Sequence, residues 1–238
     1  MKTRFIGKKV ISFSSVPSTM DEARKVVDKV PEGTVILADE QTSGRGRLDR
    51  KWVSPKGNLY MSLVLNPSLK VLPKLSLMTS LAIVNTLKKF GLSAKIKWPN
   101  DVLVGGKKIS GVLIETGLKE GDRWAIVGIG VNLNFDPDEY PEIKDIATSL
   151  KKELGREVGR DEFMNPLLEE IEELYLRLLR GESLREEWKE KMDSLGKNVK
   201  VRFGDDVEEG FAEDIDEDGF LLLRKNGEKI KIPAGEIA

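Results

Sequence analysis

The spacing of apolar residues changes several times along this chain, and each pattern predicts a different element. Apolar and polar residues alternate over 8–15 and 57–67, as in strands with one buried face, and 33–41 adds a third strand. Residues 73–91 are apolar on nearly all sides, with a proline at the start and a glycine at the end. This pattern predicts a buried central helix.

The middle of the chain predicts a run of short strands. Residues 94–98 form one, and Gly105-Gly106 separates "DVLV" from "KKISGVLIE", as in a two-residue hairpin turn. A further strand is expected over 123–134. Residues 136–149 hold two prolines and several acids, so we expect a loop there.

Two capping-box patterns predict where further helices begin. The patterns are Ser18 and Thr19 followed by Asp21 and Glu22, and Ser183 followed by Glu186. In such a box the hydroxyl and the carboxylate each accept a free N–H of the first helical turn. Helices are therefore expected over 17–30 and 183–194, and amphipathic spacing predicts another over 161–181.

Beyond Gly196 the chain changes to short strands separated by Gly-Asp, Asp-Gly and Asn-Gly turns. This pattern predicts a small five-stranded barrel. A barrel of roughly 40 residues would need to dock on a larger unit to be stable. We therefore expect two domains, residues 1–194 and 195–238. The predicted class is α+β, with a mixed or antiparallel sheet packed with helices.

The composition narrows the possible chemistry. The 238 residues include no Cys and no His, which excludes thiolate nucleophiles, disulfides and imidazole bases. The net charge of −1 gives no global attraction to nucleic acid or membrane. The start is not a signal peptide and no apolar run approaches the ~20 residues of a membrane span. We expect a cytoplasmic protein whose anion sites are local clusters of Lys and Arg.

One such cluster is the segment 41–52, "QTSGRGRLDRKW". It combines Gly44 and Gly46 with Arg45, Arg47, Arg50 and Lys51 and ends at Trp52. Glycines let a ligand approach the backbone, and the cations could surround an anion. A solvated surface loop and an Arg-Gly-rich nucleic-acid tail are the alternative interpretations. It is not a Walker A loop, because no G-K-[ST] follows.

Three further motifs contain polar residues that could bind a ligand but that also have common structural explanations. They are "KWPND", with Lys97 and Asn100; "GKKISG", with Lys108 and Gly111; and "GIGVNLN", with Asn132. Exposed lysines are usually inert and asparagines often only terminate turns. Glycines inside a strand indicate a bend or a close approach by another group.

In this order, and followed by a small barrel, the motifs resemble those of biotin protein ligases, over essentially the whole chain. The resemblance implies a class II synthetase-like fold of the biotin/lipoate ligase type with an SH3-like C-terminal barrel. It implies a biotin–[acetyl-CoA-carboxylase] ligase, which activates biotin with ATP and Mg²⁺ to biotinyl-5′-AMP. The biotinyl group then passes to a lysine of a biotin carboxyl carrier protein domain. A homodimer is also implied.

The resemblance also implies roles for individual residues. Biotin would contact Ser18, Thr19, Met20, Gln41, Gly44, Arg45, Gly46, Arg47, Lys108 and Gly111. ATP would contact Arg45, Arg47, Arg50, Lys51, Trp52, Lys97, Asn100, Lys108 and Asn132. Lys108 and Arg47 would be catalytic, and Mg²⁺ would be held mainly by the ATP phosphates.

Two departures from the family pattern are visible. Met20 stands where the family usually has Asn, and no winged-helix domain precedes the catalytic part, which implies a ligase without a DNA-binding function. Lipoate protein ligase is the nearest alternative, but its R-R-x-S-G-G-G motif and His-Asp pair are missing from this sequence. A nucleic-acid-binding module and an inactive biotin-binding relative also stay open.

Overall fold

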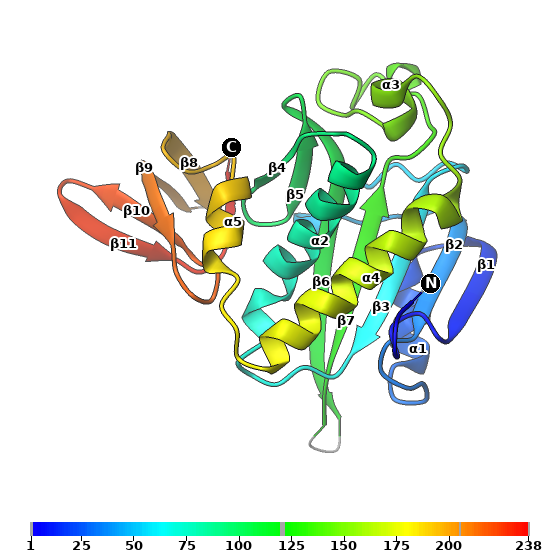
Figure 1. Cartoon of the computed structure of the whole chain (residues 1–238). Coiled ribbons are helices and arrows are strands. Elements are labelled where there is room, and N and C mark those ends of the chain that lie inside the picture. Colours follow the sequence, from blue (N-terminus) through cyan, green and yellow to red (C-terminus); the bar gives the residue numbers. More distant parts are fainter. Residues whose placement is uncertain (1, 120–121, 205, 238) are drawn as a thin grey trace.

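The main sheet has seven strands, in the order β1-β2-β3-β7-β6-β5-β4 (Figure 1). The computed structural model of the chain describes residues 2–119, 122–204 and 206–237. The strands are β1 (Val10–Val16), β2 (Val35–Gln41), β3 (Leu59–Leu65), β4 (Ala94–Lys97), β5 (Asp101–Val104), β6 (Lys107–Lys119) and β7 (Asp122–Val131). β1 runs parallel to β2, and the other neighbours pair antiparallel. The predictions of a mixed sheet and of a hairpin at Gly105-Gly106 are therefore confirmed.

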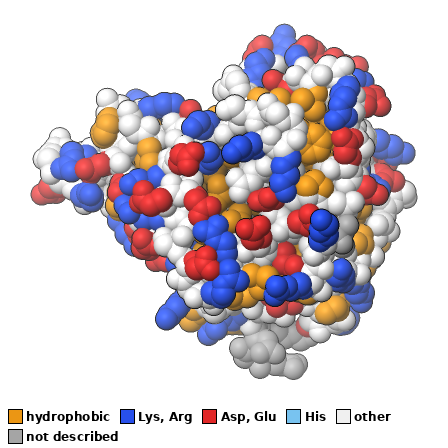
Figure 2. Space-filling model, viewed as in Figure 1, with side chains coloured by type: hydrophobic (Ala, Val, Ile, Leu, Met, Phe, Trp, Pro, Cys, Tyr) orange, Lys and Arg blue, Asp and Glu red, His pale blue; other side chains and the backbone are white. Residues whose placement is uncertain are grey.

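Helices cover both faces of this sheet. α2 (Leu75–Lys89) and α4 (Arg160–Leu179) lie across one face (Figure 1), and α1 (Thr19–Val26) packs on the other, against β2, β3 and β7. α2 is buried on nearly every side, as predicted, because it contacts the sheet, α4 and α5 (Arg185–Lys191). Figure 2 shows basic and acidic side chains interspersed over the face that carries α2 and α4, without one large basic patch.

The C-terminal part forms a second, five-stranded antiparallel sheet, in the order β11-β10-β9-β8-β12. Its strands are β8 (Asn198–Phe203), β9 (Asp206–Ile215), β10 (Leu221–Lys225), β11 (Glu228–Ile232) and β12 (Glu236–Ile237). Val201, Ala212 and Leu223 are buried in a core that is continuous with that of the main sheet. The expectation that this unit docks on the larger one is confirmed.

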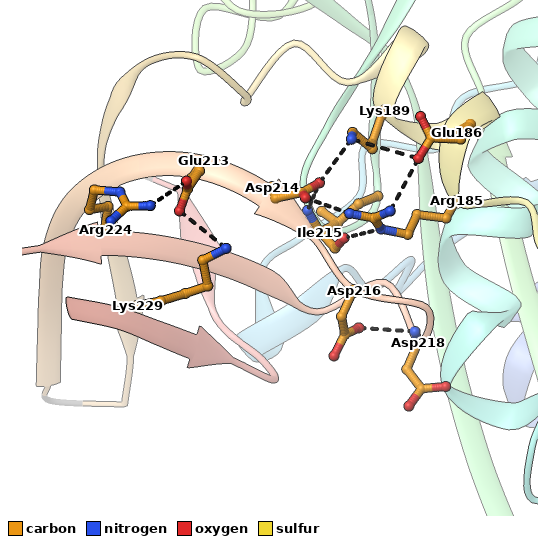
Figure 3. Close-up of polar contacts among 10 residues, drawn as sticks. All are labelled: Arg185, Glu186, Lys189, Glu213, Asp214, Ile215, Asp216, Asp218, Arg224 and Lys229. Atoms are coloured by element: carbon orange, nitrogen blue, oxygen red, sulfur yellow. Dashed lines mark hydrogen bonds and ion pairs between the residues drawn. The ribbon is translucent and has the colours of Figure 1, made fainter. Parts of the chain in front are cut away.

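Polar contacts from α5 fix the second sheet in place. Figure 3 shows Arg185 and Lys189 of α5 directed at Asp214 of β9. Arg185 Nε also donates to Ile215 O at 2.7 Å. On the other side of the junction, Trp98 Nε1 donates to Gly219 O at 3.0 Å. The C-terminal sheet is therefore held both by a helix and by the "KWPND" segment of the main unit.

Three local predictions need correction. The helix expected over 17–30 ends at Val26, and α3 (Leu150–Leu154), which was not predicted, follows the expected loop. Short 3₁₀ turns occur at Arg47–Asp49, Leu72–Lys74 and Pro137–Glu139. The Ser183–Glu186 capping box is wrong, because the N-cap of α5 is Leu184, and the Ser183 hydroxyl accepts the N–H of Arg185 and donates to Glu217. The Glu186 carboxylate pairs with Arg185 and Lys189, so it does not complete the box.

A buried carboxylate ties the N-terminal segment to α4. Glu172 is only 5% exposed and accepts the backbone N–H groups of Arg4, Phe5 and Ile6 at 2.5, 2.9 and 2.9 Å. Burial alone would raise the pKa of Glu172, but these hydrogen bonds more than offset it and lower the pKa below its usual range. The carboxylate therefore favours the folded state when it is ionised.

We predict that Glu172→Gln lowers the free energy of unfolding by about 1–3 kcal/mol at pH 7, since an amide cannot accept all three N–H groups. Because the folded-state pKa is depressed, the wild-type contribution is present at neutral pH and is lost as the pH falls through that pKa. Urea unfolding at pH 7 and pH 3 measures both effects. Glu169→Gln, one turn earlier, is the control; equal stability of the two variants would contradict the prediction.

Candidate active site

A cavity of about 440 Å³ lies on the α1 side of the main sheet, at one end of its strands. Its lining comes from the first turn of α1, the segment 41–53, the "KWPND" segment, the β5–β6 hairpin, β7 with the residues that follow it, residues 143–147 and β12. The sequence-predicted residues that line it are Ser18, Thr19, Met20, Gln41, Arg45, Gly46, Arg47, Arg50, Lys51, Trp52, Lys97, Asn100, Lys108, Gly111 and Asn132. The structure therefore brings together residues that lie up to 114 positions apart, from 18 to 132.

One end of the cavity carries a compact network of uncharged polar groups. Gln41 Oε1 accepts both the backbone N–H and the hydroxyl of Thr19, at 2.9 and 3.2 Å. Ser62 Oγ donates to Thr19 Oγ1 at 2.8 Å, and Ser18 Oγ caps α1 by accepting the Met20 N–H at 3.3 Å. Ser18 and Thr19 are nearly buried. Fixed donors and acceptors of this kind suit a small polar, uncharged group of a ligand.

Glycines form the floor of the cavity. Val127 and Ile129 of β7 point into the helix-covered core, so Gly128 and Gly130 face the cavity, and Gly111 of β6 pairs with Gly130. A Cβ on Gly128 would lie 2.6 Å from Met20 Sδ, and one on Gly130 would lie 2.6 Å from the Trp52 indole. The glycines of "GIGVNLN" are thus explained by the close approach of Met20 and Trp52, not by a bend.

The arginine loop, residues 43–52, is folded into a small hairpin. Arg45 and Lys51 pair antiparallel, Gly46 N donates to Arg50 O at 2.7 Å, and Trp52 N donates to Gly44 O at 2.9 Å. Leu48 forms the turn with a left-handed backbone, at φ 52°. Gly44 does not line the cavity; it is buried beneath the loop, where a Cβ would lie 2.5 Å from Ser54 Oγ.

The arginines of this loop contact acceptors of the protein itself. Arg45 forms a bidentate pair with Asp21, and Arg50 lies 2.6 Å from the carboxylate of Glu236. Arg47 donates to Gly235 O at 2.8 Å. Burial lowers the pKa of Arg47 below its ordinary value, although nearby acids partly oppose this shift. Arg47 and Arg50 therefore contact Gly235 and Glu236, at the start of the C-terminal strand β12.

Lys108 is held at the start of β6 by its side chain and its backbone. Its Nζ lies 2.6 Å from Asp101 Oδ1 and 5.2 Å from the centre of the Trp52 ring. Its backbone N–H donates to Ile146 O, and its carbonyl accepts the N–H of Thr148. This pairing attaches residues 146–148 to the hairpin, so the expected loop 136–149 becomes one wall of the cavity.

Of the remaining predicted residues, the two asparagines form contacts within the protein and the two lysines form no ion pair among the described residues. Asn100 Nδ2 donates to Val112 O at 2.8 Å, and Asn132 Nδ2 donates to Thr148 O at 2.9 Å, so both amides support the backbone of the wall. Within the described part of the chain, Lys51 and Lys97 form no ion pair. These two lysines can therefore meet an incoming anion without first losing a partner.

Several residues of the wall are not among the candidates that the sequence indicates. They are Val53, Trp98, Pro99, Asp101, Leu103, Gly106, Val112, Leu113, Phe135, Ile143, Asp145, Ile146, Ala147, Glu236 and Ile237. Asp101 could have been found, because it belongs to "KWPND". The contribution of β12 has no local signal, since it depends on how the two sheets dock. The described residues contain no cluster of three acidic side chains that could hold a metal ion by themselves.

Comparisons with known proteins agree with this geometry. Residues 10–134 match the Biotin/lipoate A/B protein ligase family, and residues 194–238 match the Biotin protein ligase C terminal domain. The biotin--[acetyl-CoA-carboxylase] ligase of Paracoccus denitrificans is 36% identical over 231 residues, which cover 92% of this chain and 96% of that protein. The bifunctional ligase/repressor BirA of Bacillus subtilis (strain 168) is 36% identical over 246 residues, 100% of this chain and 76% of that protein.

Solved structures show the same similarity. A biotin protein ligase from Aquifex aeolicus in complex with biotin and ATP aligns with a TM-score of 0.86 and 34% identity, over 97% of this chain and 98% of that chain. The chain therefore belongs to the Biotin/lipoate A/B protein ligase family. The predicted resemblance, including the C-terminal barrel unit, is confirmed.

We predict that Gly130→Ala lowers stability by about 1–3 kcal/mol, because its Cβ would overlap the Trp52 ring. Chemical denaturation measures this loss. In a Trp52→Leu background the smaller side chain leaves room, so the same glycine substitution should cost less, and the difference gives the coupling energy. An identical cost in both backgrounds would show that the Trp52 contact does not explain this glycine.

Proposed function

We propose that the protein activates biotin with ATP to biotinyl-5′-AMP, releasing pyrophosphate, and transfers the biotinyl group to a lysine of a biotin carboxyl carrier protein domain. Together with family membership, one observation carries the proposal: the uncharged polar end and the cationic loop line the same cavity. The Thr19–Gln41 network and the hydroxyl of Ser18 suit the ureido ring of biotin. The cationic end suits its carboxylate and the phosphates of ATP.

The first step requires no acid–base side chain, which fits a chain without His or Cys. The carboxylate of biotin is ionised at neutral pH, since its pKa is close to the ~4.3 of a glutamate. It must approach the α-phosphate, although two unit charges ~4 Å apart repel by ~4 kcal/mol at an effective dielectric constant of ~20. Arg47 and Lys108 would offset this repulsion and stabilise the charge that develops on the phosphate oxygens. Catalysis is then mainly positioning and charge neutralisation.

Nucleotide contacts would come from the rest of the wall. Lys51 and Lys97 are available to phosphates, and Arg50 can exchange the carboxylate of Glu236 for a phosphate oxygen. Phe135, Ile143 and Ile146 add an apolar surface to the same cavity, which suits the adenine ring.

The chemistry of the wall fits Mg²⁺ that arrives with ATP. Asp101, Asp145 and Glu236 are the carboxylates on the wall, and two of them already pair with Lys108 and Arg50. Mg²⁺ is commonly bound by substrate phosphates and only one or two carboxylates. The ion would add positive charge beside the phosphates.

The same proposal identifies the group that accepts biotin in the second step. The biotinyl acceptor is a lysine amine of the carrier domain, and it attacks the mixed anhydride with release of AMP.

We further propose a homodimer, since β1 leaves one edge of the main sheet unpaired among the described strands. We also propose a cytoplasmic location, where ATP is available. Residues 1–194 would form the catalytic domain and 195–238 the small domain. Among the described helices none is long and apolar enough to span a membrane.

The alternatives have weaker support. A nucleic-acid-binding function would use the arginine loop as a basic patch, but Asp21 and Glu236 neutralise part of its charge. Lipoate is the other substrate class named by the family. It has no ureido ring to occupy the hydrogen-bonding groups of Thr19 and Gln41, so we expect the protein to prefer biotin.

We predict biotin-dependent pyrophosphate release in the presence of ATP and Mg²⁺, with no comparable release when lipoate replaces biotin. Arg47→Ala and Lys108→Ala should each lower the rate by about a hundredfold or more, because each removes a charge beside the reacting phosphate. Lys107→Ala, in the same hairpin but outside the cavity wall, is the control and should retain activity. Full activity of both site variants would refute the assignment of these residues.

A further inference from the structure

The sequence predicts that Arg45 binds an anionic ligand, but the structure gives its guanidinium a partner within the protein. Its two terminal nitrogens lie 2.9 and 2.7 Å from the two carboxylate oxygens of Asp21. Two parallel charge-assisted hydrogen bonds fix orientation as well as distance. The charge of Arg45 is therefore largely neutralised where it lines the cavity.

Asp21 lies at a position that connects two parts of the site. It belongs to the first turn of α1, where its N–H donates to Ser18 O at 3.1 Å, so it moves as one unit with Ser18 and Thr19. Two backbone hydrogen bonds, each 2.9 Å, tie residues 42 and 43 to the segment just before α1. Beyond residue 43 the arginine loop folds back on itself, and the Arg45 side chain connects it to Asp21 of α1.

The conventional roles of an acid in this position do not explain Asp21. A carboxylate in the first turn often accepts a backbone N–H or stabilises the helix dipole. Here Ser18 provides the cap, and the carboxylate is directed at Arg45 instead. The hydrogen bond from Arg45 also holds the pKa of Asp21 below its usual range, so the pair is ionised at neutral pH.

We propose that Asp21 is a positioning residue that holds Arg45, and with it the arginine loop, against the biotin end of the cavity, so that biotinyl-5′-AMP is retained until transfer. This inference rests on the proposed function, because it concerns the intermediate of that reaction. The side chains of Arg45 and Asp21 are 33% and 31% exposed, and an ion pair of this kind opens at modest cost. The same contact therefore allows the loop to open for the acceptor lysine and for product release.

Asp21→Asn tests this role, because it keeps the size of the side chain and removes its charge. We expect preformed biotinyl-5′-AMP to dissociate about fivefold faster, the KM for biotin to rise by a similar factor, and the kcat for adenylation to change by less than about twofold. Arg45→Gln should produce the same faster dissociation and the same rise in KM. If the two residues act through their contact, the double variant Asp21→Asn/Arg45→Gln is no more impaired than either single variant.

Glu187→Gln is the matched control. Glu187 pairs bidentately with Arg177 through contacts of 3.1 and 2.5 Å, and neither residue lines the cavity. This variant should retain wild-type dissociation and kinetics. Unchanged dissociation in Asp21→Asn, additive effects in the double variant, or a loss confined to kcat would each overturn the positioning role while leaving the proposed function intact. A wild-type protein without biotin-dependent pyrophosphate release would instead refute the proposed function.

Discussion

Mutual repulsion among cations is the constraint around which this site is built. Six cationic side chains line one cavity: Arg45, Arg47, Arg50, Lys51, Lys97 and Lys108. Asp21, Glu236 and Asp101 pair with three of them, and Gly235 O accepts a hydrogen bond from a fourth. These acceptors stabilise the cluster before any substrate is bound. Where the acceptor is a neutral carbonyl or a partly exposed carboxylate, a phosphate can replace it, so the resting contacts resemble those that the substrate would make.

In the main sheet, the side chains that form the core and the residues that line the site lie on opposite faces, because successive residues of a strand point to opposite sides. On β7, Val127 and Ile129 complete the hydrophobic core, while Gly128 and Gly130 leave the opposite face open for Met20, Trp52 and a ligand. The second sheet closes the site from the side: α5 fixes β9 through Asp214, and β12 then presents Glu236 to the arginine loop. Docking of the two sheets is therefore part of forming the site, and loss of the Asp214 contacts would alter the cavity without touching it.

Much of this arrangement could be predicted from the sequence, because hydrophobic periodicity and turn residues report directly on local structure. The strands, the buried helix α2 and the Gly105-Gly106 hairpin are confirmed. Two of the errors have a similar cause: acidic side chains that suggest a capping box form ion pairs instead. Asp21 pairs with the arginine loop instead of completing the capping box of α1, and Glu186 pairs with Arg185 and Lys189 instead of completing that of α5. The role of β12 could not be predicted, since no local pattern indicates which cavity a terminal strand will reach.

The central claim is that the arginine loop brings two anions together by neutralising their charge. A crystal structure with bound biotinyl-5′-AMP tests it most directly. The account predicts that the ureido ring lies beside Ser18 and Thr19 and that the phosphate lies within hydrogen-bonding distance of Arg47 and Lys108, with Arg47 released from Gly235 O. A structure in which the adenylate lies outside this cavity, or in which Arg47 still contacts Gly235 O and no phosphate oxygen, would contradict it.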